Sequence, residues 1–310
     1  MKRFKNILYV SEATVDQASA VARAVTLAEN NQADLTVVDV VPHGGDDVAA
    51  DLTTSRRQAL ESLIEPHRHR LEIPTHVLAG TAFLEVIRAV LRNDHDLVIK
   101  AEEPPDSLDM MFGSDDMHLL RRCPCPVWLM KPPEKTNYNC ILAAVDFDPL
   151  QSSPTEQALN REIIELACSL ALSDFASLHL VHAWEPYAEG IMRGRGDMTG
   201  KTMASYIERE HIRHQEGLYR LGETLREHFG ADAYDYLGPR FHLLRGPARK
   251  LIPVLAEELR ADLVVMGTVA RTGISGLIIG NTAESILSRL TCSILAVKPP
   301  GFTTPVKPAD

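Results

Sequence analysis

An internal repeat constrains the fold of this chain more than any other feature of its sequence. Towards the end of each half the chain holds a cysteine, an apolar run, a lysine and a Pro-Pro pair, and the two lysines, Lys131 and Lys298, stand 167 residues apart. The segments Asn6–Glu12 and Cys140–Asp146 match in the same way, 134 residues apart. Such self-similarity predicts two copies of one structural unit in tandem. We therefore expect a first domain over residues 1–134, a second over residues 135–300 and a tail over residues 301–310.

Short apolar runs alternate with longer helical segments in both halves, and nearly continuous apolar runs indicate strands buried on both faces. In the first half we expect strands at Asn6–Val10, Asp34–Val41, His76–Leu78, Leu97–Lys100 and Val127–Met130, and helices at Val15–Asn31, Ser55–Arg70, Ala82–Asn93 and Asp115–Arg122. In the second half we expect strands at Ile141–Val145, Ser177–Ala183, Phe241–Leu244, Asp262–Met266 and Ile294–Val297, and helices at Pro154–Leu172, Thr202–His228, Ala248–Leu259 and Thr282–Arg289. The predicted fold class is α/β, with two tandem doubly wound domains, each a mainly parallel five-stranded sheet flanked by helices.

Net charge and cysteine content restrict the surroundings in which the chain works. The formal net charge is −10, which argues against a broad surface for nucleic acid or anionic lipid, because both need clustered Lys and Arg. Five cysteines in 310 residues fit a reducing compartment better than a disulfide framework. No apolar stretch is long enough to span a bilayer. We expect a cytoplasmic protein with no nucleic-acid and no membrane partner.

A glycine-rich loop in the second half carries the strongest chemical signal. It follows the strand that ends at Met266, runs from Gly267 to Gly280 and leads into a helix that begins near Asn281. Glycines let a backbone approach a ligand closely and adopt positive φ, and the N–H groups at a helix start favour an anion. These features predict a phosphate cradle. A flexible loop that ends in an Asn or Thr helix cap is the alternative interpretation.

The segments Leu119–Pro126, Gly267–Gly280 and Asn281–Glu284 resemble the universal stress protein family in its tandem, UspE-like form, and the resemblance covers essentially the whole chain. Nucleotide-binding members of that family carry Gly, two residues, Gly, nine residues, and then Gly followed by Ser or Thr. The resemblance implies an adenosine cleft that takes ATP with Mg²⁺, in which Asp146 holds the ribose or the adenine edge and the loop holds the phosphates. The ligand-binding residues that it implies are Asp146, Val181, Ala183, Met266, Gly267, Ala270, Arg271, Gly280, Asn281 and Thr282.

Departures from the family frame separate the two domains. In the second domain Ala270 replaces the inner glycine and Asn281 the hydroxyl residue, so weak ATP binding or another ligand in the same cleft are both open. In the first domain Lys100 and Glu103 stand where we align the first two glycines, and acidic residues surround them. Because like charges repel phosphates, we expect ATP in the second domain only.

Three functions are compatible with these observations. The family resemblance implies a regulatory protein that binds an adenine nucleotide and acts by conformational signalling, with no catalytic residue. Slow ATP hydrolysis is a second hypothesis, weakened because the loop holds no evident general base or Mg²⁺ ligand set. A binding module for a non-nucleotide small molecule is the third.

The final strands of the two domains are also expected to associate, because pairing would cover an apolar sheet edge. The family resemblance implies the same arrangement, an intramolecular pseudo-dimer. A homodimer of the whole chain stays open as well.

Other residues have simpler interpretations than chemistry. Cys123 and Cys125 form a CxC pair and are predicted to be buried, inert thiols. His211 and His214 stand three residues apart and could share a metal, but a solvated helix face is favoured, and no metal site is predicted. Trp184 is expected in the core, as is Trp128.

Overall fold

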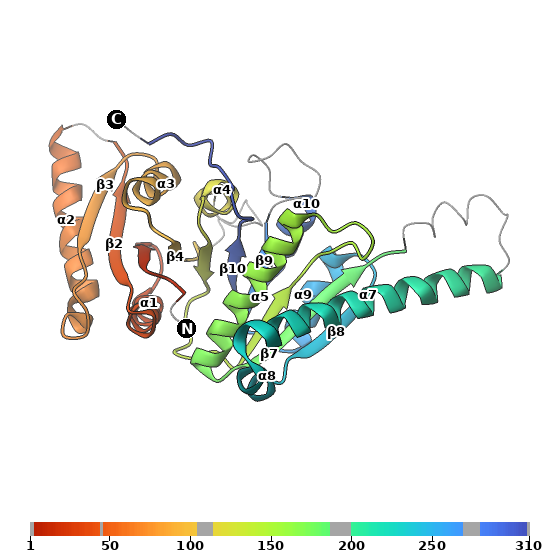
Figure 1. Cartoon of the computed structure of the whole chain (residues 1–310). Helices are drawn as coiled ribbons and strands as arrows, with labels where there is room; N and C mark the ends of the chain where they lie inside the picture. Colours follow the sequence, from red (N-terminus) through yellow and green to blue (C-terminus); the bar gives the residue numbers. More distant parts are fainter. Residues whose placement is uncertain (1–2, 44–45, 104–113, 187–199, 269–279, 309–310) are drawn as a thin grey trace.

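The computed structural model of the chain describes residues 3–43, 46–103, 114–186, 200–268 and 280–308 (Figure 1). The first half holds strands β1 (Asn6–Val10), β2 (Asp34–Val41), β3 (Thr75–Ala79), β4 (Leu97–Ala101) and β5 (Val127–Met130), and helices α1 (Ala18–Asn31), α2 (Asp46–Ile64), α3 (Ala82–Asn93) and α4 (Ser114–Arg122), with a 3₁₀ turn at Glu65–His67. The second half holds strands β6 (Cys140–Ala144), β7 (Ser177–Trp184), β8 (Arg240–Arg245), β9 (Leu263–Gly267) and β10 (Ser293–Val297), and helices α5 (Pro154–Asp174), α7 (Gly200–Phe229), α8 (Ala231–Leu237), α9 (Ala248–Glu258) and α10 (Asn281–Leu287).

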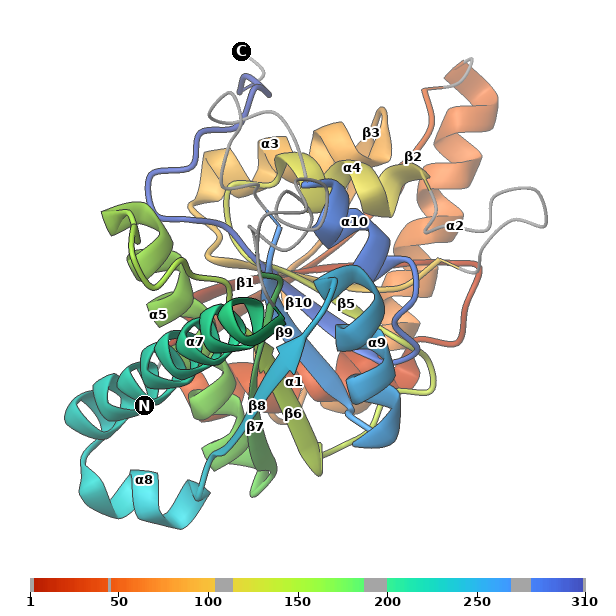
Figure 2. The same cartoon turned by 90° about the vertical axis from the view of Figure 1, so that its right-hand side faces the viewer.

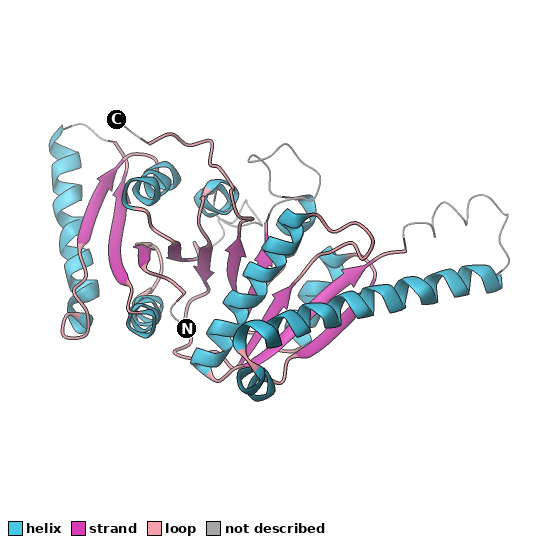
Figure 3. Cartoon of the chain, in the orientation of Figure 1, coloured by secondary structure: helices cyan, strands magenta, loops and turns pink. Residues whose placement is uncertain are grey.

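These strands form one continuous sheet in the order β3-β2-β1-β4-β5-β10-β9-β6-β7-β8 (Figure 3). Neighbours within each half are parallel. The two halves meet where β5 and β10 pair antiparallel, with Leu129 opposite Ile294. The α/β class and the repeat of one doubly wound unit are therefore as predicted, and the two final strands lie side by side as expected. The two five-stranded sheets continue into each other.

Helices cover both faces of the sheet (Figure 2). Helices α1, α2, α5, α7 and α8 pack on one face, and α3, α4, α9 and α10 pack on the other. Successive strand residues alternate between the two layers: Ile7 and Tyr9 of β1 face the first, and Leu8 and Val10 face the second. Both faces are buried, which is why the strands read as continuous apolar runs rather than as an alternation.

Reciprocal lysine contacts fasten the two halves together. Lys131, after β5, donates from Nζ to the carbonyl of Leu290 at 2.8 Å, and Lys298, after β10, donates to the carbonyl of Leu120 in α4. Both lysines come from the repeated segment, and each reaches a carbonyl at or just beyond the last turn of a helix in the other half. A cation is favoured there by the helix dipole. Arg3 adds an ion pair across the halves, 2.6 Å from Glu165.

The helices differ most from the sequence-based expectation at α2 and α8, whereas α9 was expected with its end one residue later. Helix α2 begins at Asp46 rather than at Ser55, and α8 was not expected. Gly230, with φ of +86°, separates α8 from α7. Helix α9 continues through Pro253, although proline removes one helical hydrogen bond.

The predicted core residues are buried. Trp128 and Trp184 are inside, and so are the thiols of Cys123 and Cys125, whose sulfur atoms lie 3.6 Å apart. No helix in the described part of the chain is long and apolar enough to cross a membrane. The tail leaves β10 and runs towards the first half, where Val306 packs against the core (Figure 1).

Candidate functional site

A cleft of about 700 Å³ opens at the carboxyl ends of β6 and β9, between α5, α10 and the tail. The chain runs from β6 to β7 on one side and returns through β9 to β10 on the other. Such a reversal of direction between adjacent parallel strands leaves a crevice at their carboxyl ends, and ligands of doubly wound folds bind there. The topology of the second half therefore places this cleft where a ligand is expected.

Most of the predicted site residues meet in this cleft. Seven of them line it: Asp146, Ala183, Met266, Gly267, Gly280, Asn281 and Thr282. Val181 does not, because it is fully buried on β7 among core residues, and its carbonyl accepts the N–H of Val145 at 3.0 Å. Val181 supports the backbone just before Asp146 instead. Ala270 and Arg271 lie outside the described residues.

Asp146 is held by its backbone and turns an exposed side chain to the cleft. Asn160, a buried residue of α5, accepts the N–H of Asp146 at 3.1 Å and donates its own amide to the carbonyl of Asp146 at 2.8 Å. This two-point clamp fixes the turn that follows β6. Asn160 was not predicted from the sequence, because fourteen residues separate the partners and no short motif joins them.

The two described glycines of the loop have different reasons for being glycine, and neither is positive φ as expected. A Cβ on Gly267 would lie 2.8 Å from the side chain of Leu159, so glycine here lets α5 pack against the end of β9. Gly280 is the N-cap of α10 with φ −63° and ψ 136°, which other residues also adopt. No side chain caps this helix. A missing side chain at Gly280 leaves the wall of the cleft open beside Asn281 and Thr282.

Helix α5 and the tail supply walls that the sequence did not reveal. Ser153 and Glu156 form a capping box at the start of α5, with distances of 3.2 and 2.8 Å, and both line the cleft. The Ser-x-x-Glu spacing is a signal that could have found this helix start. Pro299–Thr303 line the opposite side, so the tail is part of the site and not only a loose end.

Lys298 connects the site to the first half of the chain. Its Nζ donates to Oγ1 of Thr268 at 2.6 Å, directly after β9, and also to Leu120. Burial lowers the pKa of Lys298 to about 8. A buried lysine that loses its proton more readily than an exposed one therefore stands where the glycine-rich loop begins.

The corresponding place in the first half is filled by an ion-pair network. The Nζ of buried Lys100 lies 2.9 Å from Asp116, 2.8 Å from Glu103 and 3.0 Å from Glu12. Burial alone would lower the pKa of Lys100, but these carboxylates outweigh it and raise the pKa. The acidic residues were expected to repel phosphates as free charges. Instead, two of them, Glu103 and Asp116, bind an internal cation together with Glu12.

The sheet register also corrects the alignment of Lys100 with Gly267. Ile7 pairs with Leu97 in the first half, and the equivalent Ile141 pairs with Leu263 in the second. Lys100 therefore corresponds to Met266, because this strand is shifted by one residue relative to the 167-residue repeat. Lys100 in the first half therefore occupies the position that Met266, which lines the cleft, occupies in the second half.

His211 and His214 of α7 were expected on a solvated helix face, but both are partly buried. His214 is half-buried rather than on a solvated face, and its Nδ1 lies 2.9 Å from Nε2 of buried His182. His182 in turn stacks on Phe147 with ring centroids 4.0 Å apart. Within the described residues, no group of three or more His, Cys, Asp or Glu side chains is arranged to hold a metal.

Comparison with known proteins finds similarity to one protein family in both halves of the chain. The profile of the universal stress protein family matches residues 3–131 and 137–298. The universal stress protein E homolog of Haemophilus influenzae is 29% identical over 317 residues, which covers 96% of this chain and 98% of the relative. Universal stress protein E of Escherichia coli K12 is 29% identical over 326 residues, covering 100% and 99%. A solved structure of a functionally unknown protein from Pseudomonas aeruginosa PAO1 is 27% identical, with a TM-score of 0.68 and coverage of 96% and 94%.

Proposed function

Since the chain belongs to the universal stress protein family, we propose that it is a cytoplasmic stress-response regulator whose second half binds an adenine nucleotide, ATP with Mg²⁺. The bound nucleotide would change the conformation of the protein, and a partner protein would bind one of the two conformations. The observation that carries the proposal is the cleft at the carboxyl ends of β6 and β9, which gathers seven predicted ligand residues. Its volume of about 700 Å³ falls in the range of small-molecule sites.

Each wall of the cleft offers a group suited to one part of a nucleotide. The exposed carboxylate of Asp146 is placed to accept hydrogen bonds from ribose hydroxyls or an adenine amine. Asn281 and Thr282 are exposed on the first turn of α10 and offer side-chain donors to phosphate oxygens. Ala183 and Met266 provide an apolar surface on which a base can lie. Arg271 is proposed to balance phosphate charge because it is a basic residue of the glycine-rich loop.

The first half is proposed to bind no nucleotide. Lys100 and its three carboxylates already satisfy one another inside the sheet end where a ligand would sit. Displacing them would leave buried charges unpaired, which costs several kcal/mol. The asymmetry of the two halves supports one ligand per chain.

The first prediction tests the ligand directly. Purified protein, heated to release bound ligand, should yield a supernatant with the ultraviolet spectrum of adenine. Titration calorimetry of the emptied protein with ATP and Mg²⁺ should show one site. Gly280→Val should weaken ATP binding by at least about tenfold, or roughly 1.4 kcal/mol, because a branched side chain would enter the open wall beside Asn281.

The matched control is Gly113→Val, the position that the repeat aligns with Gly280. It should leave ATP affinity unchanged. Equal losses in both variants would contradict a site in the second half alone. A wild-type protein that binds no ATP, or that releases a compound without the adenine spectrum, would favour the non-nucleotide module. Phosphate release from ATP would favour slow hydrolysis.

A further inference from the structure

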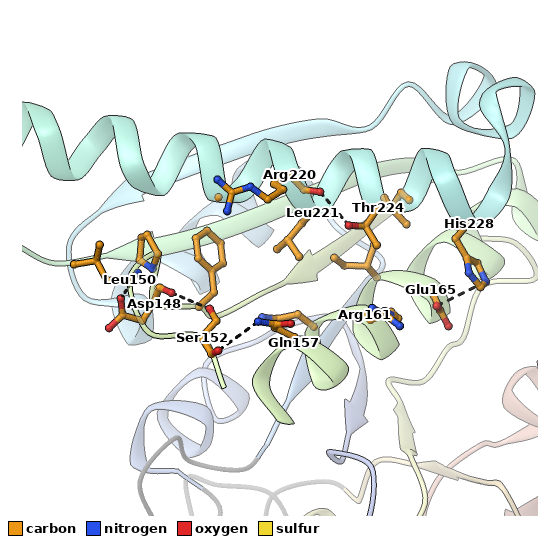
Figure 4. Close-up of a pocket in the computed structure, with 16 residues that line it drawn as sticks. Asp148, Leu150, Ser152, Gln157, Arg161, Glu165, Arg220, Leu221, Thr224 and His228 are labelled. Atoms are coloured by element: carbon orange, nitrogen blue, oxygen red, sulfur yellow. Dashed lines mark hydrogen bonds and ion pairs between the residues drawn. The ribbon is translucent and has the colours of Figure 1, made fainter. Parts of the chain in front are cut away.

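A second cavity lies on the other side of α5, between this helix and α7 (Figure 4). Its volume is about 450 Å³, enough for a small organic molecule. Among the described residues, Asn160 is the only one that lines both this groove and the nucleotide cleft. The groove is a separate site, because its other lining residues come from the α7 side of α5 and from the loop after β6.

The floor of the groove is apolar. Phe147, Ile164 and Leu225 are buried there, and Leu221 packs beside them. Leu150 stands at one end with 67% of its surface exposed. The apolar surface that water still reaches in the groove belongs to the partly buried Leu221 and the exposed Leu150, and it favours a ligand with an apolar body that would cover it.

Two arginines line the groove without an ion-pair partner among the described residues. Arg161 of α5 and Arg220 of α7 line it from opposite helices, and in the described part of the chain neither guanidinium forms an ion pair. The acidic side chains of the groove are already engaged. Asp148 accepts the N–H of Leu150 at 2.8 Å, and Glu165 pairs with Arg3 at 2.6 Å.

Two neighbouring arginines outside the groove have ion-pair partners. Arg213, about two turns earlier on α7, pairs with Glu210 at 2.6 Å, and Arg3 pairs with both Glu162 and Glu165. Figure 4 shows Arg220 and Arg161 on the two helices that form the groove. Two unmatched guanidinium groups beside an apolar floor suit a planar anion, because guanidinium can bind a carboxylate through two parallel hydrogen bonds.

We propose that the α5–α7 groove is a second binding site, for a small organic acid whose apolar body lies on Phe147 and Leu221 and whose carboxylate is bound by Arg220 and Arg161. This site is independent of the proposed nucleotide. It takes a different chemical class and uses different side chains.

The test compares two probes of the same shape, 2-naphthoate and its neutral amide, 2-naphthamide, by titration calorimetry with the full chain. Naphthoate should bind at least about tenfold more tightly than the amide. Arg220→Gln together with Arg161→Gln should remove this difference, and lysine at both positions should restore part of it. Arg213→Gln, on the same helix but outside the groove, should leave both affinities unchanged.

Filling the groove should abolish binding of both probes. Thr224→Trp does this from α7, and Gln157→Trp does it from α5, so that one variant remains if the other does not fold. Gly280→Val, in the nucleotide cleft, should have no effect on naphthoate. Equal affinity for naphthoate and naphthamide would overturn the proposal, and so would naphthoate binding that survives both tryptophan variants.

Discussion

Lys100 and Met266 occupy equivalent positions in the two halves, and their side chains give the two sheet ends different roles. Met266 lines an open cleft, whereas Lys100 is surrounded by carboxylates and is almost fully buried. Each of the three carboxylates contacts Lys100, yet a buried ion pair is only weakly stabilising overall because its desolvation offsets its attraction. Its more definite effect is that it occupies the place of a ligand. Removing Lys100 or one of its carboxylates would lower the stability of the fold, because a buried charge would be left without its partner.

The second prediction follows at this scale. Lys100→Met, which copies the second half, should lower the free energy of unfolding by about 3 kcal/mol at pH 7, because Asp116 is left charged and buried. Burial already raises the pKa of Asp116, although Lys100 lowers it in part. Without Lys100 that pKa rises further, so the variant gains a proton in its folded state as pH falls. Its deficit relative to wild type should therefore shrink between pH 7 and pH 5, measured by urea unfolding.

The double variant Lys100→Met with Asp116→Asn is the control for this prediction. It should recover part of the lost stability at pH 7, because an amide is cheaper to bury than an unpaired carboxylate. A deficit that is the same at both pH values would show that lost packing, and not the buried charge, is responsible. ATP binding should be unaffected in every variant.

At the scale of elements, two glycines let α7 approach its neighbours closely: Gly217 faces Phe147, and Gly222 faces Phe241 of β8. A Cβ on Gly217 would lie 2.4 Å from Cε2 of Phe147, and this ring cannot easily retreat because it stacks on His182. The third prediction is that Gly217→Ala lowers the free energy of unfolding by about 1–3 kcal/mol through overpacking. This outweighs the gain of about 1 kcal/mol that alanine gives a helix interior.

Chemical denaturation measures this effect. The neighbouring Glu216→Ala changes an exposed side chain on the same helix and should stay within about 0.5 kcal/mol of wild type. A more stable Gly217→Ala variant would mean that α7 moves freely away from the sheet, contrary to the packing seen at Phe147.

The elements also show how far the sequence alone could predict the fold. Every strand was located within a residue or two, because strands buried on both faces are short apolar runs between polar segments. Helix α8 was missed because Gly230 marks the end of the preceding helical segment, and the seven residues of α8 that follow it are too few to show a helical period of their own. The start of α2 was missed because residues 46–54 show no clear apolar period.

The candidate site was predictable only where it follows a local motif. The loop frame predicted Gly267, Gly280, Asn281 and Thr282, and the family resemblance predicted Asp146 at the end of the first strand of the second half. Asn160 and the wall Pro299–Thr303 reach the cleft through tertiary folding and have no local signature. Val181 was expected at the site but is buried within β7, whereas Ala183, on the same face and two residues nearer the carboxyl end, borders the cleft. The sequence did not show how far along the strand the cleft begins.

On the scale of the whole molecule, the two repeats are joined through the final strand of each. The β5–β10 pair joins two sheets into one, so that neither final strand is left as an edge. Lys131 and Lys298 then cross the joint in opposite directions. Lys298 contacts Thr268 directly after β9 as well as Leu120 of the other half, so one side chain links the joint to the start of the glycine-rich loop beside the cleft.

The fourth prediction concerns the pH dependence of this joint. Burial lowers the pKa of Lys298 to about 8, from 10.5 in the unfolded chain. Between these values the unfolded state keeps a proton that the folded state has lost, so unfolding becomes harder as pH rises. Relative to Lys298→Met, the wild-type protein should gain roughly 3 kcal/mol in free energy of unfolding from pH 8 to pH 10.5, measured by urea titration at intervals across this range. Lys307→Met removes the same charge from the exposed tail, and its difference from wild type should stay constant. A constant difference for Lys298→Met would instead mean that Lys298 keeps its proton at the joint, and that the contacts with Leu120 and Thr268 hold a charged ammonium throughout.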